Sequence, residues 1–465
     1  MHQPTDDHSG IATTTHDPVA EFTTWRDGLV ANSAFRCEPM PLSASQQWSL
    51  RDGAVRHRTG GFFSLVGLRV TARRPELGGE QLIILQPETA INGFLLRAHP
   101  EGGQLLFQGR VEPGNAGVLQ LAPTVQSTEA NYKRLHGGKA TACLSWFGPT
   151  GNGRIVYDEL QSEEGTRYYG KYNRNVVVDV GTRAVECPST FRWYGIDALR
   201  RFAVTSNVLN TDSRSVLAGL DWSLLAPGGV PFAGAAPGSF RAALLASHHA
   251  PEGCDAHTDA ELLAWLTRLR VRVSPRHHVL PLSELTNWEI GDGEIRERSR
   301  EHGFRARHFQ VHALGREVED WDQPLIDSDG IGSMILVAQQ RDGVLRFLAK
   351  ASHEIGFLEG VQCGASVTIA PGERPSEDPV ERQLLDSIES GRAVVRMGCR
   401  QSEEGGRFFH DENDYAVVEL DPGVELPDAP FYRWLSLAQV HRLVRVPGFF
   451  SMEFRGVLAL LLAEL

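Results

Sequence analysis

The sequence predicts an α+β protein made of two tandemly duplicated modules, each a curved mixed β-sheet with packed helices. The main observation is a repeat, because the nonapeptide QSEEGTRYY at Gln161 returns as QSEEGGRFF at Gln401. A longer stretch that begins FRWYGI at Phe191 matches one that begins YRWLSL at Tyr432, with nearly the same spacing. Ordered self-similarity of this kind indicates internal duplication. Within each copy, short apolar and β-branched runs such as EQLIILQP and RNVVVDV are typical of strands.

The composition is that of an ordinary globular protein with room for more than one core. The chain has 465 residues, of which 41 % are hydrophobic and 22 % are charged. No apolar run approaches the roughly 20 residues that a membrane-spanning helix needs. The N-terminus lacks the basic and apolar regions of an export signal. We therefore expect a cytoplasmic protein.

Charge and cysteine content bear on two further classes of function. The formal net charge of −12 argues against a nucleic-acid partner, because such binding normally needs a basic face. A small anionic ligand held by a few local arginines remains compatible with it. The six cysteines form no C-x-x-C pair, which favours free, mostly buried thiols over a disulfide framework or a zinc site.

The expected order of segments is a disordered tail, a first module, a connector and a second module, at 1–16, 17–225, 226–279 and 280–465. A first helix is expected after Asp17-Pro18, where apolar residues recur at helical spacing. The connector is rich in Gly and Pro, and Thr258 with Glu261 has the pattern of a capping box that starts a helix. Other helices are expected after Ser127 and around 196–203, between the strands.

The densest polar stretch of the first module spans 109–138. Pro113-Gly114 suits the central positions of a type II turn, which would hold Glu112 and Asn115 on either side of it. After a strand, Ser127 can cap a short helix that carries Lys133, Arg134 and His136 at its end. The free N–H groups at the start of such a helix are a seat for phosphate.

The segment after each nonapeptide differs in charge. The first copy continues GKYNRN, with Lys171 and Arg174, whereas the second reads HDENDY, with Asp411 and Asp414 at the matching places. Guanidinium groups bind phosphate oxygens and carboxylates repel them. This contrast predicts that only the first module is equipped for an anionic ligand.

Taken together, several motifs resemble those of the NDP-hexose 2,3-dehydratase family. They are FFSLVGLRV, QPETAINGFLL, VEPGN, QLAPTVQSTEANYKRLHGG, LQSEEGTRYYGKYNRN and the later QSEEGGRFF, which are spread over most of the chain. The resemblance implies two Nudix-like modules per subunit, a homodimer, a thymidine-diphosphate 4-keto-6-deoxyhexose from an antibiotic sugar pathway as substrate, and no added cofactor. The second half departs from the family pattern, since it lacks the Pro-Thr-Val-Gln element found at 123–126.

A metal-dependent hydrolase is a poor alternative, because the chain has no Nudix box with its Arg-Glu and paired-glutamate helix and therefore no metal ligands of that kind. The substrate implied by the resemblance suggests the chemistry instead. A C4 ketone acidifies the C3 proton, a base removes it, and the C2 hydroxyl leaves with a proton from an acid. The enol that forms relaxes to a 3,4-diketo-2,6-dideoxyhexose, so that the ketone itself is the electron sink.

Three residues are candidates for the catalytic groups, and each has a structural alternative. Glu112 is the candidate base, or else a solvated carboxylate of a turn. His136 is the candidate acid or oxyanion donor, or else a histidine that complements a helix dipole. Tyr132, like Tyr168, is a candidate donor to the C4 oxygen, or else a core aromatic residue.

The candidate substrate-binding residues are polar or basic side chains of the same two stretches: Asn115, Gln126, Thr128, Asn131, Arg134, Arg167, Lys171, Asn173, Arg174 and Asn175. For the basic ones, contact with the diphosphate competes with ordinary surface pairing. The glutamates of QSEEG occur in both copies and are interpreted as part of the scaffold, with Arg167 and Arg407 as possible partners across the turn.

The leading hypothesis is therefore a lyase that removes water across C2 and C3 of a nucleotide-linked 4-ketohexose. A non-catalytic nucleotide-sugar binder or pathway scaffold is the alternative from another class, and a C3/C4 isomerase is a third possibility. Loss of one water from the substrate distinguishes the lyase from both.

Overall fold

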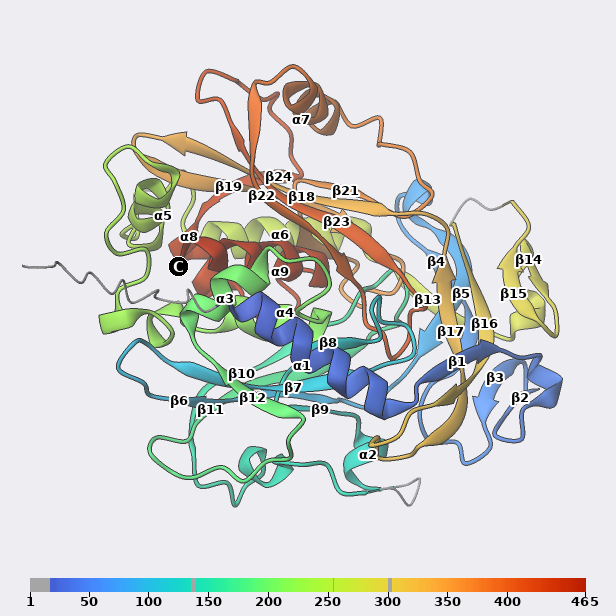
Figure 1. The fold of residues 1–465 in the computed structure, drawn as a ribbon. Coiled ribbons are helices and arrows are strands. Elements are labelled where there is room, and N and C mark those ends of the chain that lie inside the picture. The colour runs from blue at the N-terminus through green and yellow to red at the C-terminus, as the bar shows by residue number, and fades with distance from the viewer. Residues whose placement is uncertain (1–16, 135–138, 254, 300–302) are drawn as a thin grey trace, which may run out of the picture.

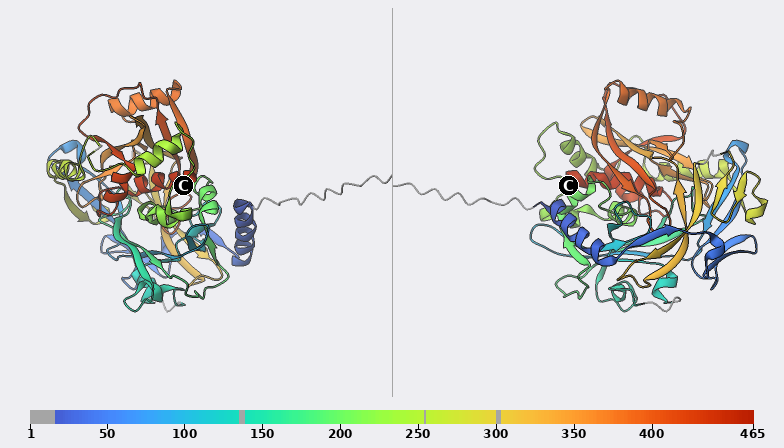
Figure 2. Two further views of the ribbon diagram at one scale, coloured as in Figure 1. Left: turned by 90° about the vertical axis from the view of Figure 1, so that its left-hand side faces the viewer. Right: turned by 45° about the vertical axis from the view of Figure 1, so that its right-hand side comes forward.

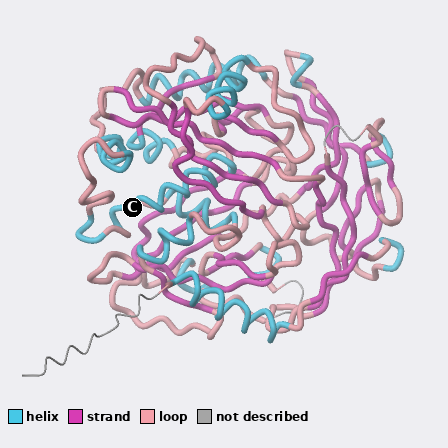
Figure 3. The backbone as a smooth tube through the Cα atoms, turned by 45° about the horizontal axis from the view of Figure 1, so that its top comes forward, coloured by secondary structure: helices cyan, strands magenta, loops and turns pink. Residues whose placement is uncertain are grey.

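The structure is a computed structural model that describes residues 17–134, 139–253, 255–299 and 303–465. Two larger sheets face each other across a layer of helices, and two smaller sheets pack together at one end (Figures 1 and 3). The predicted tail lies outside the described residues. Within them, no helix combines the length and the apolar character that crossing a bilayer requires.

The first larger sheet belongs to the first half and has the order β10-β11-β6-β7-β12, with β8 on β7 and β9 on β6. Its strands are β6 (Ile91–Arg97), β7 (Gln104–Val111), β8 (Leu119–Ala122), β9 (Val125–Ser127), β10 (Arg154–Ser162), β11 (Tyr172–Asp179) and β12 (Phe191–Tyr194). The pair β11–β6 is parallel and the other pairs of this sheet are antiparallel. The sheet is therefore mixed, as the sequence predicted.

The second larger sheet repeats this arrangement, with the order β20-β19-β18-β23-β22, β21 on β18 and β24 on β19. Its strands are β18 (Gly332–Arg341), β19 (Val344–His353), β20 (Val361–Gly364), β21 (Val367–Ile369), β22 (Ala393–Ser402), β23 (Glu412–Leu420) and β24 (Tyr432–Ser436). Here too one central pair, β18–β23, is parallel. The two sheets confirm that the chain consists of two repeated halves.

The two smaller sheets exchange their first strands between the halves. One contains β2 (Trp48–Arg51), β3 (Ala54–His57), β4 (Ser64–Thr71), β5 (Gly79–Leu85) and β13 (Arg276–Leu280). The other contains β14 (Trp288–Ile290), β15 (Glu294–Glu297), β16 (Phe304–His312), β17 (Asp320–Ser328) and β1 (Arg36–Pro39). Since β1 pairs with β16 and β13 pairs with β4, each half supplies one strand to the other. The modules are interleaved and do not simply follow one another in space.

The helices are α1 (Pro18–Ser33), α2 (Glu129–Tyr132), α3 (Ile196–Ala203), α4 (Thr211–Gly219), α5 (Phe240–His248), α6 (Asp259–Val273), α7 (Pro379–Glu389), α8 (Leu437–Leu443) and α9 (Met452–Leu458). The predicted starts of α1 and α6 are confirmed, because Asp17 caps α1 and Thr258 with Glu261 forms a complete capping box. The helix α1 lies on the outside of the molecule against α3 and β7 (Figure 2).

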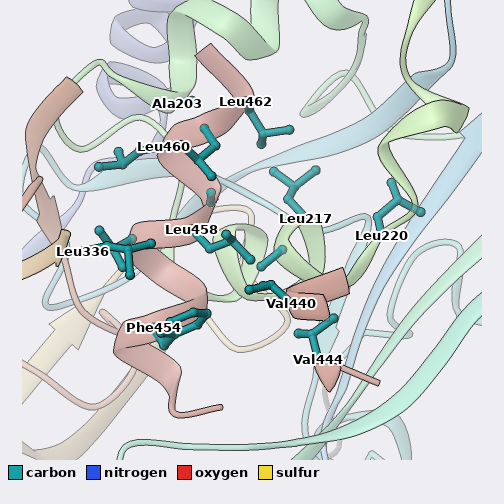
Figure 4. Packing of buried hydrophobic residues seen from close by; sticks show 14 of the residues in the cluster. Ala203, Leu217, Leu220, Leu336, Val440, Val444, Phe454, Leu458, Leu460 and Leu462 are labelled. Carbon is teal, nitrogen blue, oxygen red and sulfur yellow. The ribbon is translucent and has the colours of Figure 1, made fainter. Parts of the chain in front are cut away.

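The main core fills the space between the larger sheets. The helices α4 and α9, which are repeat equivalents, pack against each other at its centre. Leu217 of α4, Phe454 and Leu458 of α9, and Leu336 of β18 belong to one buried apolar cluster (Figure 4). Because apolar side chains from both halves are removed from water together, the free energy of burial stabilises the pair of modules as a unit.

The repeated nonapeptides join the halves. The turn at Gly114 donates its N–H to the carbonyl of Gly405 (2.8 Å), and its own carbonyl accepts the N–H of His410 (2.8 Å). The equivalent turn at Gly356 makes the reciprocal contact, since its N–H donates to the carbonyl of Gly165 (2.8 Å). Each nonapeptide therefore packs against the turn of the other copy, which explains why both copies keep it.

Three local expectations are wrong. Asn115 N–H donates to the Glu112 carbonyl (3.3 Å), so a turn exists, but Gly114 does not have the positive φ that a type II turn requires. The helix expected after Ser127 is the short helix α2, and its cap is Thr128 and not Ser127. The Ala130 N–H at its start, which was expected to be free for phosphate, donates to Glu88 (2.9 Å). Five cysteines are unpaired as predicted, but of these only Cys363 is buried.

Substitution of Gly114 by alanine tests the contact between the turn and the nonapeptide. A Cβ at Gly114 would lie 1.5 Å from the Phe408 carbonyl oxygen, a backbone atom that cannot move aside alone. We expect Gly114→Ala to lower the free energy of unfolding by about 1–3 kcal/mol or more in urea denaturation. Gly28→Ala is the control, because nothing lies within 4 Å of its Cβ position. Equal stability of the two variants would contradict the contact.

Candidate active site

A cavity of about 370 Å³ lies where the first larger sheet meets the smaller sheets. Its lining comes from both halves of the chain. The first half supplies residues of β3, β6, β9 and β11, the end of β7 and the first turn of α4, and the second half supplies the β16–β17 hairpin and the second nonapeptide. A cavity of this size is typical of a small-molecule site.

Glu112 follows directly after β7 and is almost fully buried in this lining, with 3 % of its surface exposed. Its Oε1 accepts hydrogen bonds from Arg110 Nε (3.0 Å) and Gln126 Nε2 (3.1 Å). Its Oε2 is buried and has no hydrogen-bond partner among the described residues. Because buried polar atoms are nearly always paired, an orphaned carboxylate oxygen in a cavity is poised to accept a proton or a hydrogen bond from a ligand.

A second carboxyl group, Asp212, lies in the first turn of α4 and lines the same cavity. Its Oδ1 accepts a hydrogen bond from Asn92 Nδ2 (2.6 Å) on β6. Burial raises the pKa of Asp212 well above its ordinary value, and the charges of Glu163, Glu404 and Glu112 add to this rise. The site therefore contains two carboxyl groups with different hydrogen-bond partners.

Lys171 directly precedes β11, and Asn173 lies at the start of that strand. Lys171 Nζ donates to the Glu88 carbonyl, and burial lowers the pKa of this ammonium group, although nearby Glu163 and Glu88 oppose the change. Asn173 accepts the N–H of Ala90 (3.1 Å) and donates to Glu163 (2.5 Å). These contacts place an ammonium group and an amide beside the carboxyl groups.

Two arginines of the second half reach the same cavity. Arg316 comes from the β16–β17 hairpin and donates to the Val111 carbonyl. Arg407 comes from the second nonapeptide, donates to Gln86 Oε1 (3.3 Å) and lies 4.3 Å from the centre of the Phe63 ring. With Arg58 and Arg110 they provide the lining with a set of guanidinium groups suited to phosphate oxygens.

The smaller sheets contribute aromatic residues to the lining. Trp48, His57, Phe62 and Phe63 come from β2, β3 and the loop before β4, and Trp321 comes from β17. The His57 ring interacts with Thr59 Oγ1 (2.8 Å) and Gln47 Oε1 (3.1 Å), and burial lowers its pKa. Little in the sequence singles out this histidine, because it stands alone before a strand.

The second half has an equivalent cavity of about 500 Å³. Strand register identifies the matching positions, since Gln108 faces Phe191 in the first half and Lys350 faces Tyr432 in the second. The carboxyl groups are kept, but the polar and basic partners are not. Glu354 and Glu453 stand where the first cavity has Glu112 and Asp212, while Ser352, Met334, Thr368 and Asp411 stand in place of Arg110, Asn92, Gln126 and Lys171.

The two cavities therefore differ in charge. Within the described lining, the first has five Arg or Lys side chains against five Asp or Glu, and the second has three against six. The second balance disfavours an anionic ligand, whereas the first is neutral overall and so opposes an anion less. No three His, Cys, Asp or Glu side chains of the described residues are grouped as a metal site requires.

The structure brings six of the predicted site residues together in the first cavity: Glu112, Gln126, Thr128, Asn131, Lys171 and Asn173. Asn115 lies behind this lining against Gly405. Asn175 is also buried, and it donates to Ser215 Oγ (2.9 Å). Tyr132 and Arg134 are outside the lining that the structure describes. His136 falls outside the described residues, so its role stays a prediction.

Two of the basic residues predicted to bind the substrate, Arg174 and Arg167, do not line the first cavity. Arg174 forms a two-pronged ion pair with Asp158 (2.7 Å) on the neighbouring strand, and in the second half Asp414 pairs in the same way with Arg400 (2.9 Å). The charge contrast at that position thus serves strand pairing. Arg167 lines the second cavity, over the Phe304 ring, while its repeat equivalent Arg407 lines the first.

Sequence reasoning did not single out several other residues that line the first cavity, among them Asn92, Arg110, Asp212, Arg316, Glu404 and Arg407. Glu404 and Arg407 belong to the repeated nonapeptide, whose recurrence predicts a scaffold role alone. The useful signal was the repeat itself, because an element kept in both copies can pack against the opposite copy. Asp212 lies in the repeated stretch that begins at Phe191, in which Arg214 matches Arg455 of the second copy. The repeat pointed to this segment but not to a role for its carboxyl group.

Comparison with known proteins supports the repeat. A family model described as NDP-hexose 2,3-dehydratase matches residues 19–220 and again 259–461. A solved structure, the Ap4A hydrolase of C. elegans, shares 12 % identity over 25 % of this chain and 86 % of its own, with a TM-score of 0.17, which is too low to assign a fold.

Three relatives match almost the whole chain. Each is called a dTDP-4-dehydro-6-deoxy-alpha-D-glucopyranose 2,3-dehydratase. The protein of Streptomyces violaceoruber is 35 % identical over 95 % of this chain and 96 % of its own length. Those of Amycolatopsis orientalis and Saccharopolyspora spinosa are 29 % and 30 % identical, over 97 % and 95 % of this chain and 90 % and 91 % of their own.

Proposed function

This chain belongs to the NDP-hexose 2,3-dehydratase family, and from that premise we propose that it removes water from its substrate in the cavity beside Glu112. It is a carbon–oxygen lyase that acts on a dTDP-4-keto-6-deoxyhexose in deoxysugar biosynthesis, as the names of its relatives indicate. Relatives from antibiotic-producing genera fit a role in antibiotic sugars.

The observation that carries the assignment is the unpaired Oε2 of Glu112. Two donors hold Oε1 and so fix the carboxylate, which leaves Oε2 to take the C3 proton that the C4 ketone acidifies. The electron pair moves toward the C4 oxygen, and the C2 hydroxyl then leaves. The enol that remains relaxes to the 3,4-diketo-2,6-dideoxyhexose.

Charge that develops on the C4 oxygen needs a donor in a site from which water is excluded. Lys171 Nζ is buried in the lining, and its neighbour Asn173 is held in place by the contacts of its amide. We assign Lys171 to this role. Removal of one such donor typically costs about 3 kcal/mol of transition-state stabilisation.

The guanidinium groups of Arg58, Arg316 and Arg407 are proposed to hold the diphosphate, and the aromatic side chains of the smaller sheets to contact the thymine. Two of the three arginines belong to the second half. The site therefore needs both copies, although the first cavity alone has as many basic as acidic side chains in its described lining.

Arg407 and Arg167 form a matched pair that tests this placement, because they occupy the same position of the nonapeptide but line different cavities. We expect Arg407→Met to weaken dTDP binding about tenfold or more, since a charge-assisted contact contributes about 1.5–3 kcal/mol. Arg167→Met should leave the affinity within about twofold. Isothermal titration calorimetry with dTDP measures both, and the reverse order would place the nucleotide in the second cavity.

The reaction itself is tested by incubating the chain with the dTDP-4-keto-6-deoxyhexose and following its mass. Loss of one water is expected. Binding without a change in mass would leave only the binder or scaffold role, and deuterium incorporation at C3 at constant mass would indicate an isomerase.

We infer Nudix-like modules from the family resemblance and from the parallel central pair repeated in both larger sheets. A homodimer is implied by the resemblance alone, and light scattering of the purified chain would test it. A cytoplasmic location is inferred from the sequence, and fractionation of the producing cell would test it.

A further inference from the structure

We propose that Asp212 is the acid that protonates the C2 hydroxyl as it leaves. This inference rests on the proposed function of the cavity and adds the second proton transfer to it. Glu112 removes the proton from C3, and the C–H electron pair passes through the C4 enolate to form the C2–C3 double bond. The C2–O bond breaks, and the carboxyl proton of Asp212 joins the departing oxygen, so that water leaves. Asp212 is then a carboxylate and Glu112 a carboxylic acid, and exchange with solvent restores both.

The first support is position. Asp212 and Glu112 line one cavity, and two hydrogen bonds connect the helix of Asp212 to Glu112. Asn210, the N-cap of α4, donates to Gln126 Oε1 (2.8 Å), and Gln126 donates in turn to Glu112 (3.1 Å). The helix that carries the proposed acid is thus fixed to the side chain that orients the base. A base and an acid that act on adjacent carbons need such a fixed separation.

The second support is the way Asp212 is held. Asn92 donates to Oδ1 (2.6 Å), so that the carboxyl group is oriented and Oδ2 is the oxygen on which a proton can sit. A neutral carboxyl group can place its proton on that oxygen. This arrangement suits donation to a ligand atom rather than to the protein.

The third support is the charge around Asp212. Glu112 with Arg110 approaches from β7, Glu163 from the end of β10, Glu404 from the second nonapeptide, and Asn92 from β6. Three carboxyl groups oppose one guanidinium, and the residue Asp212 is 3 % exposed. Burial and like charge both favour the protonated form and so raise the pKa of Asp212. A departing hydroxyl needs a donor whose surroundings favour the protonated form.

The second cavity provides a natural comparison. Glu453 occupies the position of Asp212, but Met334 stands where Asn92 would orient it, and Ser352 stands where Arg110 would bind the neighbouring carboxylate. The second cavity therefore keeps two carboxyl groups, but it lacks the amide and the guanidinium that give the two carboxyl groups of the first cavity different hydrogen-bond partners. Glu453→Gln is therefore the matched control for a change at Asp212.

A purely structural role for Asp212 makes a different prediction. A carboxylate in the first turn of a helix interacts favourably with the helix dipole, and its loss would change stability without changing the chemistry. The test must therefore separate C3 proton removal from loss of the hydroxyl. Exchange of the C3 proton with solvent deuterium reports the first, and loss of water reports the second.

The experiment compares Asp212→Asn with the parent chain on the natural substrate and on its 2-deoxy-2-fluoro analogue. We expect C3 exchange within a few-fold of the parent and water loss slower by about 10²–10⁴-fold. Fluoride leaves without a proton, so its release from the analogue should stay within about tenfold of the parent rate. Glu453→Gln should match the parent in every measurement.

The outcomes that overturn the proposal are specific. Unchanged water loss in Asp212→Asn would show that another group, such as His136, supplies the proton. Equal slowing on both substrates, or loss of C3 exchange, would assign Asp212 to positioning or to the base. Thermal melting shows whether Asp212→Asn folds, and if it does not, Asp212→Glu replaces it because glutamate keeps a carboxylic acid. We expect Asp212→Glu to lose water at a rate within about 10²-fold of the parent. Its ratio of rates on the natural substrate and on the fluoro analogue should equal that of the parent. Failure of the proposed function itself would appear differently, as no water loss in the parent chain.

Discussion

Glu112→Gln is expected to slow both C3 proton exchange and water loss by about 10²–10⁴-fold. The amide has nearly the shape of the carboxylate, and one of its atoms can still accept from Arg110 and Gln126. It cannot take a proton from carbon, however. Binding of dTDP should change little, because the diphosphate is assigned to the arginines. Solvent-deuterium exchange followed by NMR, with calorimetry for binding, measures both properties.

Glu354→Gln is the matched control, since Glu354 occupies the same position of the second copy and lines the other cavity. Its activity should equal that of the parent chain. If Glu354→Gln lost water elimination while Glu112→Gln kept it, the reaction would have to be assigned to the second cavity. Comparable losses in both would mean that the two cavities act together.

Arg455→Met is expected to lower the free energy of unfolding by about 3–5 kcal/mol. Arg455 is fully buried between the halves, where it donates to Ser215 Oγ (2.9 Å), to the Phe450 carbonyl (2.6 Å) and to the Ser162 carbonyl. Methionine fills much of the volume but leaves these acceptors unpaired. It also removes the cation that faces the buried carboxyl groups of Glu163 and Glu453. Urea denaturation monitored by tryptophan fluorescence measures the loss.

An exposed arginine serves as the comparison. Arg400 has 45 % of its side chain exposed and pairs with Asp414 across a strand ladder. Because solvent screens such a pair, Arg400→Met should lower the free energy of unfolding far less than Arg455→Met does. Similar losses for the two variants would mean that the contacts of Arg455 between the halves add nothing beyond a surface ion pair.

Local patterns were sufficient for many elements of the fold. The helix after Asp17-Pro18, the capping box at Thr258 and the strands of QLIIL and NVVVD formed where they were expected. Each depends on near neighbours in the sequence, so its signal is complete within a short window. The turn at Gly114 shows the limit of this reasoning. Its glycine is required by a carbonyl far away in the sequence, at Phe408, and not by its own φ.

The sequence also pointed to only some of the residues of the candidate site. Glu112, Gln126, Lys171 and Asn173 were identified because they lie in two dense polar stretches. Arg174 belonged to the same pattern, yet it pairs with Asp158 on the neighbouring strand, a partner that composition cannot reveal. Asp212 lies in the polar run NTDSRS, outside the two stretches that supplied the candidates, and it gains its character from carboxyl groups on three other segments.

Repeats and family motifs are linear patterns, and for that reason the sequence was enough to identify a duplicated α+β protein of the dehydratase family. Three other facts emerged from the folded chain alone: each nonapeptide packs on the opposite copy, Arg407 and not Arg167 reaches the first cavity, and Asp212 lines the same cavity as Glu112. Burial, charge and hydrogen bonding act over a few ångströms in space, whatever the distance along the chain. The strands exchanged between the halves bring together residues that are hundreds of positions apart.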